Sequence, residues 1–588
     1  MKKERLLIMK SAEKEKAFHF RGFFTRYQSE IAMIIGIAAI VYFGMYNISK
    51  NTSLRIVGDE FGYWSAGATF AGIDWKSVAS YNSFYGYGYG IILAPILKLG
   101  VPQTVKYQIA IGVNVFMLVC IYTLIYRTLK KEGSQPVQAM FIALVSTLYS
   151  GNLVYAQYTF SETFILFLYI LFVISFTAFL KKEKVAYAIL LPIIICILLA
   201  THKRTVALVP VLAVFFIFLL LKWKNYRALL AFVLSAILIA ASYYVITKLY
   251  KEAINLRNPN TNQLSGQIGK IKELFTAEGV SKFFIGFLGK TAYSGLTSFS
   301  IVFVAAVRIV KNICSEIRSG KIRKITLLGL YFLTNLLAME AISTVFLLDF
   351  TGRRDLLTYG RYHEFTVSVL IVYELYMGFV KREKLHLTQI VFSGSLAIAL
   401  TITVYHFLPN LNATGHMAVS SPGISFFLND KDHLILLLII CLAVMLMYYY
   451  SISCSAGLLK EKSHQTAAVA LVLIMLFSYV AYTSLNKTYS WSIEGCTREE
   501  KLARRIQEDE AVEKIMYYVP DSTIDIDFMQ FLLNDKSITC FSDVSVLDDL
   551  GENDRILTTV KSRLITDEWN EQYELLGSSS FLKYWKKK

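Results

Sequence analysis

Two adjacent carboxylates, Asp59 and Glu60, follow the first long apolar run of the chain by about ten residues. Neighbouring residues point in different directions in a helix or a strand, so one acid can face a reaction while the other anchors the loop. A carboxylate within hydrogen-bond reach of a hydroxyl can remove its proton as a general base. The pair therefore indicates proton abstraction, although a solvated acidic loop would carry the same two residues.

A Gly-Tyr run, Ser83-Phe-Tyr-Gly-Tyr-Gly-Tyr-Gly90, lies further along the same loop and contains Tyr85, Tyr87 and Tyr89. Flat amphipathic rings suit the faces of sugars and also suit the headgroup layer of a membrane. We expect the three tyrosines to line a sugar site. The alternative is an aromatic belt at the membrane surface.

The elements that position these residues are predicted to be membrane helices. Apolar residues make up 55% of the 588 and charged residues only 18%, against about a quarter charged in an ordinary soluble domain. The apolar residues gather in runs of roughly 20, the length that spans a bilayer core. This pattern excludes a soluble globular protein, a disordered chain and a disulfide-rich peptide. It predicts a polytopic, all-α membrane bundle.

We predict about thirteen spans, an odd number that places the two chain ends on opposite faces of the membrane. A basic segment, residues 1–28, precedes the first span and holds the N-terminus in the cytoplasm. The transmembrane domain extends over 29–484, and its first external loop, 49–104, carries Asp59-Glu60. The predicted spans lie near 30–48, 105–126, 137–155, 162–180, 185–200, 205–221, 228–247, 292–310, 325–348, 365–380, 388–408, 433–450 and 466–484.

Lys and Arg concentrate in the loops predicted to be cytoplasmic, and two outer clusters depart from this rule. Cations fixed at the outer membrane edge can bind a phosphate, Arg by two parallel hydrogen bonds and Lys as a point charge. Contact with anionic headgroups is the alternative explanation. The first cluster is His202, Lys203 and Arg204, and the second is Arg353, Arg354, Arg361 and His363.

Glu162 begins the predicted fourth span, on the outer side, directly after Ser161. Ser161 suits the N-cap position, and an acid in the first turn suits the helix dipole, so a structural role is sufficient. The same position also places a carboxylate at the outer face. The functional alternative is a contact with an acceptor or a metal.

The charge balance reverses near residue 485. The first 484 residues carry 46 basic and 23 acidic side chains, whereas the remaining residues carry 14 and 20. We predict a small extracytoplasmic α/β domain at 485–588, with a helix over 498–518 and strands at 522–527, 537–541 and 555–560. Cys496 and Cys540 fall in this domain, either as a disulfide or as two separate thiols.

The acid pair just after the first span resembles the signature of the GT-C superfamily of integral-membrane glycosyltransferases, in particular its protein O-mannosyltransferase and aminoarabinose-transferase branches. The Gly-Tyr run with Pro95, Ser161-Glu162, the thirteen spans and the external C-terminal domain are also similar to that group. The resemblance covers the whole architecture, but its residue-level part is short. It implies sugar transfer, with inversion, from a polyprenyl-phosphate donor to an acceptor hydroxyl at the outer face of the cytoplasmic membrane.

For individual residues, the resemblance implies Asp59 as the general base and Glu60 as a supporting or acceptor-orienting group, with the opposite assignment open. It also implies a second acidic motif at Glu162. A divalent metal is a further option if Asp59, Glu60, Glu162 and His363 converge, although no metal-spacing motif is present. The donor phosphate is expected to meet Arg361 and Lys203 first, with Arg204, Arg353, Arg354 and His363 as further candidates.

Two other classes of function compete with the transferase. A secondary transporter or lipid flippase would use charges at mid-membrane, for which Glu340 and Glu374 qualify. A membrane scaffold or receptor would explain the C-terminal domain but not Asp59-Glu60. The chain has no glycine motif for nucleotides, and its cytoplasmic loops explain the basic excess without a nucleic-acid partner. Acceptors of four classes stay compatible with the sequence: a protein, a teichoic-type polymer, a lipid and a glycan.

Overall fold

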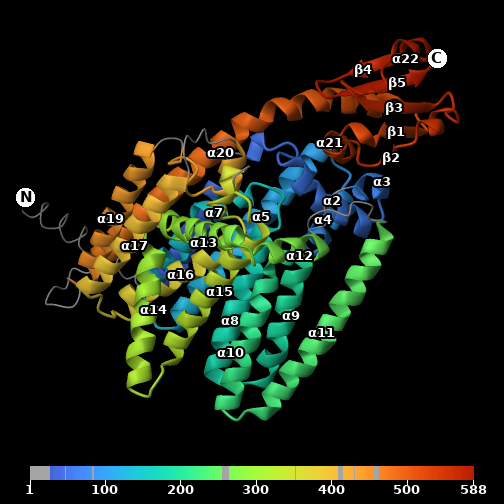
Figure 1. The fold of residues 1–588 in the computed structure, drawn as a ribbon. Coiled ribbons are helices and arrows are strands. Elements are labelled where there is room, and N and C mark those ends of the chain that lie inside the picture. The colour runs from blue at the N-terminus through green and yellow to red at the C-terminus, as the bar shows by residue number, and fades with distance from the viewer. Residues whose placement is uncertain are drawn as a thin grey trace, which may run out of the picture.

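A computed structural model describes residues 27–46, 48–81, 85–254, 264–350, 353–407, 415–428, 431–453 and 463–588. Figure 1 shows a bundle of helices, with a small sheet domain projecting from one end on helix α20 (Ser463–Glu508). The predicted fold class, an all-α membrane bundle with a small C-terminal α/β domain, is confirmed.

Nine helices within the described ranges are long and apolar enough to cross a membrane, or up to eleven if each of two bent pairs is one span. The predicted count of thirteen is therefore not confirmed. The nine are Tyr27–Lys50, α5 (Gln103–Lys131), α8 (Glu162–Lys182), Lys203–Lys222 with α10 (Leu208–Lys222), α11 (Tyr226–Ala253), α15 (Lys324–Phe346), α17 (Leu387–Phe407), Asp432–Ser453 within α19 (Lys431–Ser453), and Ala467–Ser490 within α20.

The bent pairs and two short helices explain the difference in the count. The bent pairs are α6 (Pro136–Thr147) with α7 (Ser150–Ala156), and α13 (Ala277–Thr297) with α14 (Ile301–Arg318). The predicted spans at 185–200 and 365–380 correspond to α9 (Val185–Thr201) and to α16 (Glu364–Leu375), which continues as one π-helical turn, η4 (Tyr376–Val380). A further short helix, α12 (Leu264–Glu273), precedes α13.

The span predicted at 292–310 is not one continuous helix, because α13 and α14 meet there at 108°. Phe299 and Ser300 have positive φ angles of 49° and 67°, which end α13 and redirect the chain. The Ser298 hydroxyl then accepts a hydrogen bond from the Val302 N–H and holds the first turn of α14. The apolar run continues across this corner without a break, so hydropathy alone shows no bend.

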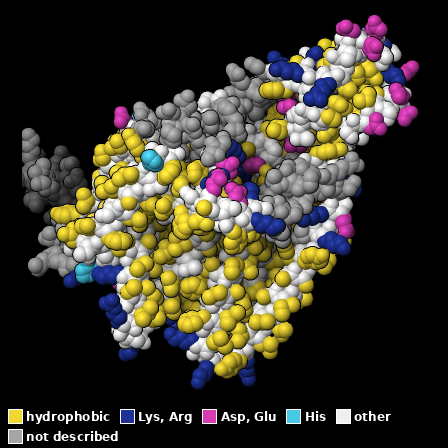
Figure 2. Space-filling view, in the orientation of Figure 1, with side chains coloured by type: hydrophobic (Ala, Val, Ile, Leu, Met, Phe, Trp, Pro, Cys, Tyr) yellow, Lys and Arg dark blue, Asp and Glu magenta, His cyan; other side chains and the backbone are white. Residues whose placement is uncertain are grey.

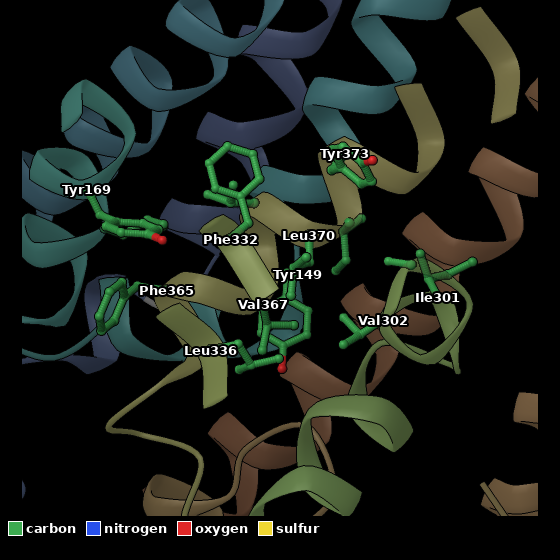
Figure 3. Close-up of a cluster of buried hydrophobic side chains, with 14 of the residues drawn as sticks. Tyr149, Tyr169, Ile301, Val302, Phe332, Leu336, Phe365, Val367, Leu370 and Tyr373 are labelled. Atoms are coloured by element: carbon green, nitrogen blue, oxygen red, sulfur yellow. The ribbon is translucent and has the colours of Figure 1, made fainter. Parts of the chain in front are cut away.

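The core of the bundle is aromatic and aliphatic, and it packs α8, α14, α15 and α16 together. Figure 3 shows Tyr169, Phe332 and Phe365 on one side of this cluster and Ile301 and Val302 on the other. The rings of Tyr169 and Phe365 meet edge to face with their centroids 5.0 Å apart, a favourable geometry for aromatic pairs. This packing fixes the N-terminal part of α8 and the start of α16, which border the candidate site.

The loop after the first span, residues 49–104, contains three helices, α2 (Val57–Ala71), α3 (Lys76–Ala79) and α4 (Gly88–Leu97). Glycines let α2 and α4 touch, since a Cβ on Gly90 would lie 2.6 Å from the Ala66 Cβ. Gly86 has a φ of 157° and passes against the end of α9, where a Cβ would lie 2.5 Å from the Thr201 carbonyl oxygen. The glycines of the Gly-Tyr run therefore serve close packing of the backbone.

The C-terminal domain contains one sheet of order β2-β1-β3-β5-β4, parallel for β2, β1 and β3 and antiparallel for the rest. The strands predicted at 537–541 and 555–560 are confirmed as β2 (Ile538–Phe541) and β3 (Asp554–Thr559). The other elements are β1 (Lys514–Tyr518), α21 (Ile524–Leu533), the short helices η6 (Val519–Asp521), η7 (Val544–Leu547) and α22 (Asp567–Gln572), β4 (Tyr573–Ser578) and β5 (Leu582–Lys587).

Two elements of this domain differ from the prediction. The strand predicted at 522–527 is wrong, since this segment leads into α21. The alternation Ile-Asp-Ile-Asp is typical of a strand, but Phe528, Met529, Phe531 and Leu532 continue it as a buried helical face. The helix predicted at 498–518 ends at Glu508, and its last part forms β1. The boundary predicted between 484 and 485 lies inside α20, and the Cys496 side chain is outside the described part of the chain.

The sheet domain docks on the loop after the first span. The Trp75 indole N–H donates to the Asn534 carbonyl oxygen at 2.7 Å, and the Cys540 N–H donates to the Ser77 hydroxyl at 2.8 Å. The buried Phe531 ring of α21 meets Trp64 of α2, with centroids 5.1 Å apart. The domain thus rests directly on α2, the helix that carries Asp59.

Candidate active site

Asp59 lies in the first turn of α2, where an acid suits the helix dipole. Its Oδ1 accepts a hydrogen bond from the Tyr85 hydroxyl at 2.6 Å, and its Oδ2 forms an ion pair with Arg361. Its side chain keeps 28% of its surface exposed. Asp59 therefore faces outward while a tyrosine and an arginine hold it.

Glu60 has the opposite environment, because its side chain is fully buried. Its Oε1 accepts hydrogen bonds from the backbone N–H groups of Arg55 and Ile56 at 2.7 and 2.9 Å. Its Oε2 accepts from the Tyr107 hydroxyl at 2.6 Å and from the N–H and hydroxyl of Thr159 at 3.0 and 2.6 Å. Glu60 ties the start of α2 to α5 and to the segment before α8, so it acts as an anchor.

Arg361 joins the two acidic motifs. The chain before α16 supplies it, and this segment is fixed where the N–H groups of Gly360 and Arg361 donate to the Ser420 carbonyl oxygen. Its Nε donates to Glu162 Oε1 at 2.6 Å, while its Nη1 contacts Asp59. The guanidinium also lies over the Phe160 ring, 3.9 Å from the centroid. Residues 302 positions apart in the sequence thus meet at one point.

Arg204 completes this cluster from the turn between α9 and α10. Its Nη1 donates to Glu162 Oε1 at 3.0 Å, and its side chain is fully buried. Two carboxylates, Asp59 and Glu162, therefore face two guanidiniums. The Ser161 hydroxyl does not cap α8 as predicted. It donates a hydrogen bond to the Tyr63 hydroxyl at 2.8 Å instead.

The electrostatics follow from this pairing. Burial raises the pKa of Asp59, but the charge of Arg361 and the hydrogen bonds from Tyr85 and Arg361 outweigh burial and hold that pKa below 3.8. Burial and the Asp59 charge raise the pKa of Tyr85 well above 10.0, so the phenol stays protonated and donates. Asp59 is an ionised carboxylate across the neutral range.

The cluster is closed in this structure. Beside Glu162, Arg204, Arg361 and Glu364 lies a cavity of about 10 Å³, room for roughly one water molecule. Arg361 keeps only 6% of its side chain exposed. A substrate must therefore displace the ion pairs or widen the crevice before it reaches Arg361 or Glu162.

The remaining predicted cations have different surroundings. Arg353 is exposed and pairs with Asp355 at 2.6 Å, and its charge still lowers the pKa of Asp59. Lys203 is adjacent, since its N–H donates to the Tyr85 carbonyl oxygen at 3.3 Å. The side chain of Arg354 is outside the described part of the chain.

The two histidines do not act as cations here. His202 is buried, and its Nδ1 accepts from the Arg204 N–H at 3.2 Å. His363 packs edge to face on Tyr293, with centroids 5.7 Å apart. Burial, then the charges of Lys290 and Arg204, lower the pKa of His363 to about 3, so the ring is neutral. The expectation that His363 binds phosphate as a cation does not fit this environment.

Only one of the three predicted tyrosines borders the acid. Tyr85 reaches Asp59, whereas Tyr87 is buried against Tyr250, and the Tyr89 hydroxyl donates to Asn114 at 2.9 Å inside the core. The three tyrosines stand at alternate positions, but α4 begins at Gly88, so their side chains do not share one face. Tyr63, Tyr107 and Thr159 contact the acidic motifs and were missed, since no local spacing marks such contacts.

The metal hypothesis finds little support in the geometry. Among the described residues, no group of three or more His, Cys, Asp or Glu side chains is arranged to hold an ion. Asp59 and Glu162 face Arg361, and Glu60 faces five hydrogen-bond donors. The residues present therefore do not fit a divalent ion.

The acids of the transporter hypothesis have partners in the bundle. Glu374 accepts from the Arg308 guanidinium at 2.8 to 3.1 Å and from the Tyr448 hydroxyl at 3.0 Å. Glu340 accepts from Ser294 at 2.6 Å and from Thr291 at 2.9 Å. These contacts give both acids a structural role inside the bundle.

The chain is similar to known proteins in its fold and not in its sequence. No protein-family model matches the chain, and no curated protein sequence matches it. The crystal structure of ArnT from Cupriavidus metallidurans in the apo state is similar, with a TM-score of 0.52 and 10% identity, over 94% of this chain and 97% of that chain. The same protein bound to undecaprenyl phosphate gives 0.53 at the same identity and coverage. The chain therefore shares the fold of these ArnT structures, the fold that the resemblance to aminoarabinose transferases implied.

Proposed function

We propose that this chain, which has the fold of ArnT, is a membrane glycosyltransferase that takes a sugar from a polyprenyl-phosphate donor. The observation that carries the proposal is the contact of Asp59 with Arg361 and Tyr85 at one end of the helix bundle. A partly exposed carboxylate next to a guanidinium supplies a base for the acceptor and a cation for the leaving phosphate. One of the similar ArnT structures has undecaprenyl phosphate bound, which supports the same class of donor.

The proposed reaction is a single displacement with inversion. The acceptor oxygen attacks the anomeric carbon while its proton passes to Asp59. The bond from that carbon to the phosphate oxygen breaks on the opposite side, and the polyprenyl phosphate leaves with the electron pair. A positioned base of this kind typically contributes a factor of about 10²–10⁴ to the rate.

Arg361 has a second part in this proposal. With no donor bound, it holds Asp59 ionised and keeps the pKa of that carboxylate low, which makes Asp59 a weak base. An arriving phosphodiester competes for the same guanidinium. When Arg361 turns toward phosphate, Asp59 loses its main cationic partner and becomes more basic, so donor binding activates the base. Lys203 and Arg353 then lie at the rim as further phosphate contacts, while Arg204 stays buried with Glu162.

The proposed orientation places Asp59 outside the cytoplasmic membrane. Figure 2 shows Lys and Arg side chains at the lower ends of the helices, opposite the sheet domain. Cytoplasmic ends carry the basic excess in membrane proteins, which supports an external C-terminal domain and a cytoplasmic N-terminus. The acceptor enters from the outer face, and a protein, a teichoic-type polymer, a lipid and a glycan are its candidate classes.

The test is transfer from a labelled polyprenyl-phosphate sugar in membranes that contain the full chain. Asp59→Asn is expected to lower the rate at least about 100-fold, as the loss of a general base does. Asp74→Asn is the matched control, because Asp74 is an exposed acid of the same loop. Undiminished transfer by Asp59→Asn would remove the assignment, and solute movement without any sugar transfer would favour the transporter.

A further inference from the structure

A second, larger cavity lies at the opposite ends of the same helices. It has a volume of about 360 Å³ and is lined by α5, α8, α15 and α16 with η4. Glu162 begins α8 at the candidate active site, whereas Lys181, near the end of α8, lines this cavity. At 1.5 Å per residue the two residues are separated by about 28 Å. The cavity is therefore distinct from the site around Asp59.

The wall of this cavity is almost entirely apolar. Val173 and Ile174 of α8, Leu328 and Phe332 of α15, and Val369 of α16 contribute to it. Figure 3 shows Phe332 next to Tyr373, which also lines the cavity. Val173 and Ile174 are only half-buried, so the wall extends to the lipid-facing surface. A space of this kind suits a hydrocarbon chain.

The rim of the cavity is cationic. Lys181, Lys324 and Lys381 come from three segments far apart in the sequence, and all three line the same cavity. Glu132 is the single acid among the lining residues, and it pairs with Lys181. Lys324 pairs with Glu183 at 2.9 Å and keeps 47% of its side chain exposed. Lys381 lies over the Tyr376 ring, 5.4 Å from its centroid. An apolar space with three lysines at its mouth matches an anionic amphiphile.

We propose that this cavity binds one anionic glycerophospholipid from the leaflet opposite Asp59. An acyl chain occupies the apolar space, and the headgroup phosphate contacts Lys381, Lys324 and Lys181. A zwitterionic lipid carries its own cation toward the three lysines and is disfavoured. The tail of a polyprenyl donor would also fit an apolar wall, but its phosphate belongs at the other face and would leave the lysines without an anion.

The headgroup, not the chain, has to supply the selectivity. A lipid leaving the bilayer exchanges one hydrocarbon environment for another, so burial of its chain gives little net gain. Each Lys near an anionic headgroup contributes an effect of about fivefold in affinity. Three lysines, two of which share their charge with a carboxylate, then predict a preference for an anionic lipid of roughly 10- to 100-fold.

The experiment measures lipid retention by the purified full chain, using native mass spectrometry. Phosphatidylglycerol, phosphatidylcholine and undecaprenyl phosphate are titrated separately and in competition. One phosphatidylglycerol is expected to bind at saturation and to resist displacement by the other two lipids. Val173→Phe narrows the cavity and should abolish this saturable binding, whereas Val214→Phe, the same change at an exposed lipid-facing position, should preserve it.

A charge variant covers the case in which Val173→Phe fails to fold. Lys381 lies on the surface, and Lys381→Gln is expected to weaken phosphatidylglycerol binding about fivefold. Lys222→Gln, outside the cavity lining, serves as its control and should leave binding unchanged. Equal retention of phosphatidylcholine, an unchanged affinity in Lys381→Gln, or preferential binding of undecaprenyl phosphate would each overturn the proposal.

Discussion

Glu60→Gln and Asp59→Asn are expected to have opposite consequences, although the two acids are adjacent. Glu60 accepts five hydrogen bonds, two on Oε1 and three on Oε2. A glutamine has one accepting oxygen, so its amide nitrogen must face donors on one side. The less costly orientation keeps the three contacts on the Oε2 side and opposes the N–H groups of Arg55 and Ile56.

The magnitude follows from these contacts. A hydrogen bond to a charged group contributes about 1.5–3 kcal/mol, so losing two costs about 3–6 kcal/mol. Glu60 is fully buried, and water does not replace the lost contacts. Asp59 is 28% exposed, and its pairing with Arg361 is partly screened, so Asp59→Asn is expected to cost only about 1 kcal/mol.

The assay combines thermal unfolding with sugar transfer, both on the purified full chain. Glu60→Gln should lower the apparent Tm by about 5 °C or more, while the folded fraction keeps transfer within about tenfold of the wild type. Asp59→Asn should keep its Tm and lose transfer by a factor of about 10²–10⁴. A stable but inactive Glu60→Gln, together with an active Asp59→Asn, would refute this division of roles and make Glu60 the base.

Three further predictions address the site and the docked domain. Arg361→Gln should lower transfer at least about 100-fold and raise the KM for the donor, and Arg361→Lys should restore part of both; an unchanged donor KM would contradict phosphate binding by Arg361. Because Asp59 acts as a carboxylate and its pKa lies below 3.8, kcat/KM should stay flat from about pH 5 to 7 and fall only at lower pH. In Arg361→Gln the raising effect of burial on the pKa of Asp59 is no longer outweighed, so the fall of kcat/KM at low pH should shift to higher pH. A fall at the same pH as in the wild type would argue against Asp59 as the base. Phe531→Ala removes a buried ring between Trp64 and Tyr107 and should cost about 3–5 kcal/mol, seen as faster proteolysis of the sheet domain, whereas the half-exposed Phe581→Ala should behave as the wild type.

The sequence identified the main partners of the site but not their connections. Asp59 was marked by its place after the first span, and Arg361 by its departure from the charge rule. That they form an ion pair depends on the packing of α2 against the segment before α16, which no local pattern encodes. Tyr107 and Thr159 donate hydrogen bonds to Glu60, and these contacts too depend on tertiary packing.

Local backbone geometry accounts for the predictions that were wrong. Hydropathy detects apolar length but not direction, so the corner at Phe299 and Ser300 is absent from it. The Gly-Tyr alternation suggested one aromatic face, but the start of α4 at Gly88 separates Tyr85 from Tyr89. At Ile524 the alternation of apolar and acidic residues is a strand pattern, and the helix prevails because the apolar residues that follow are buried at helical spacing.

Helix α20 is one uninterrupted helix of 46 residues that begins in the membrane and ends at the sheet domain. In an α-helix each added residue advances the end by 1.5 Å and turns it by about 100°. A single insertion between the bilayer and the sheet would therefore swing the domain away from Trp75 and Ser77, the residues that receive it. We expect the length of this connection to be invariant, unlike that of a flexible linker, since its register aligns the sheet domain with the helix that bears Asp59.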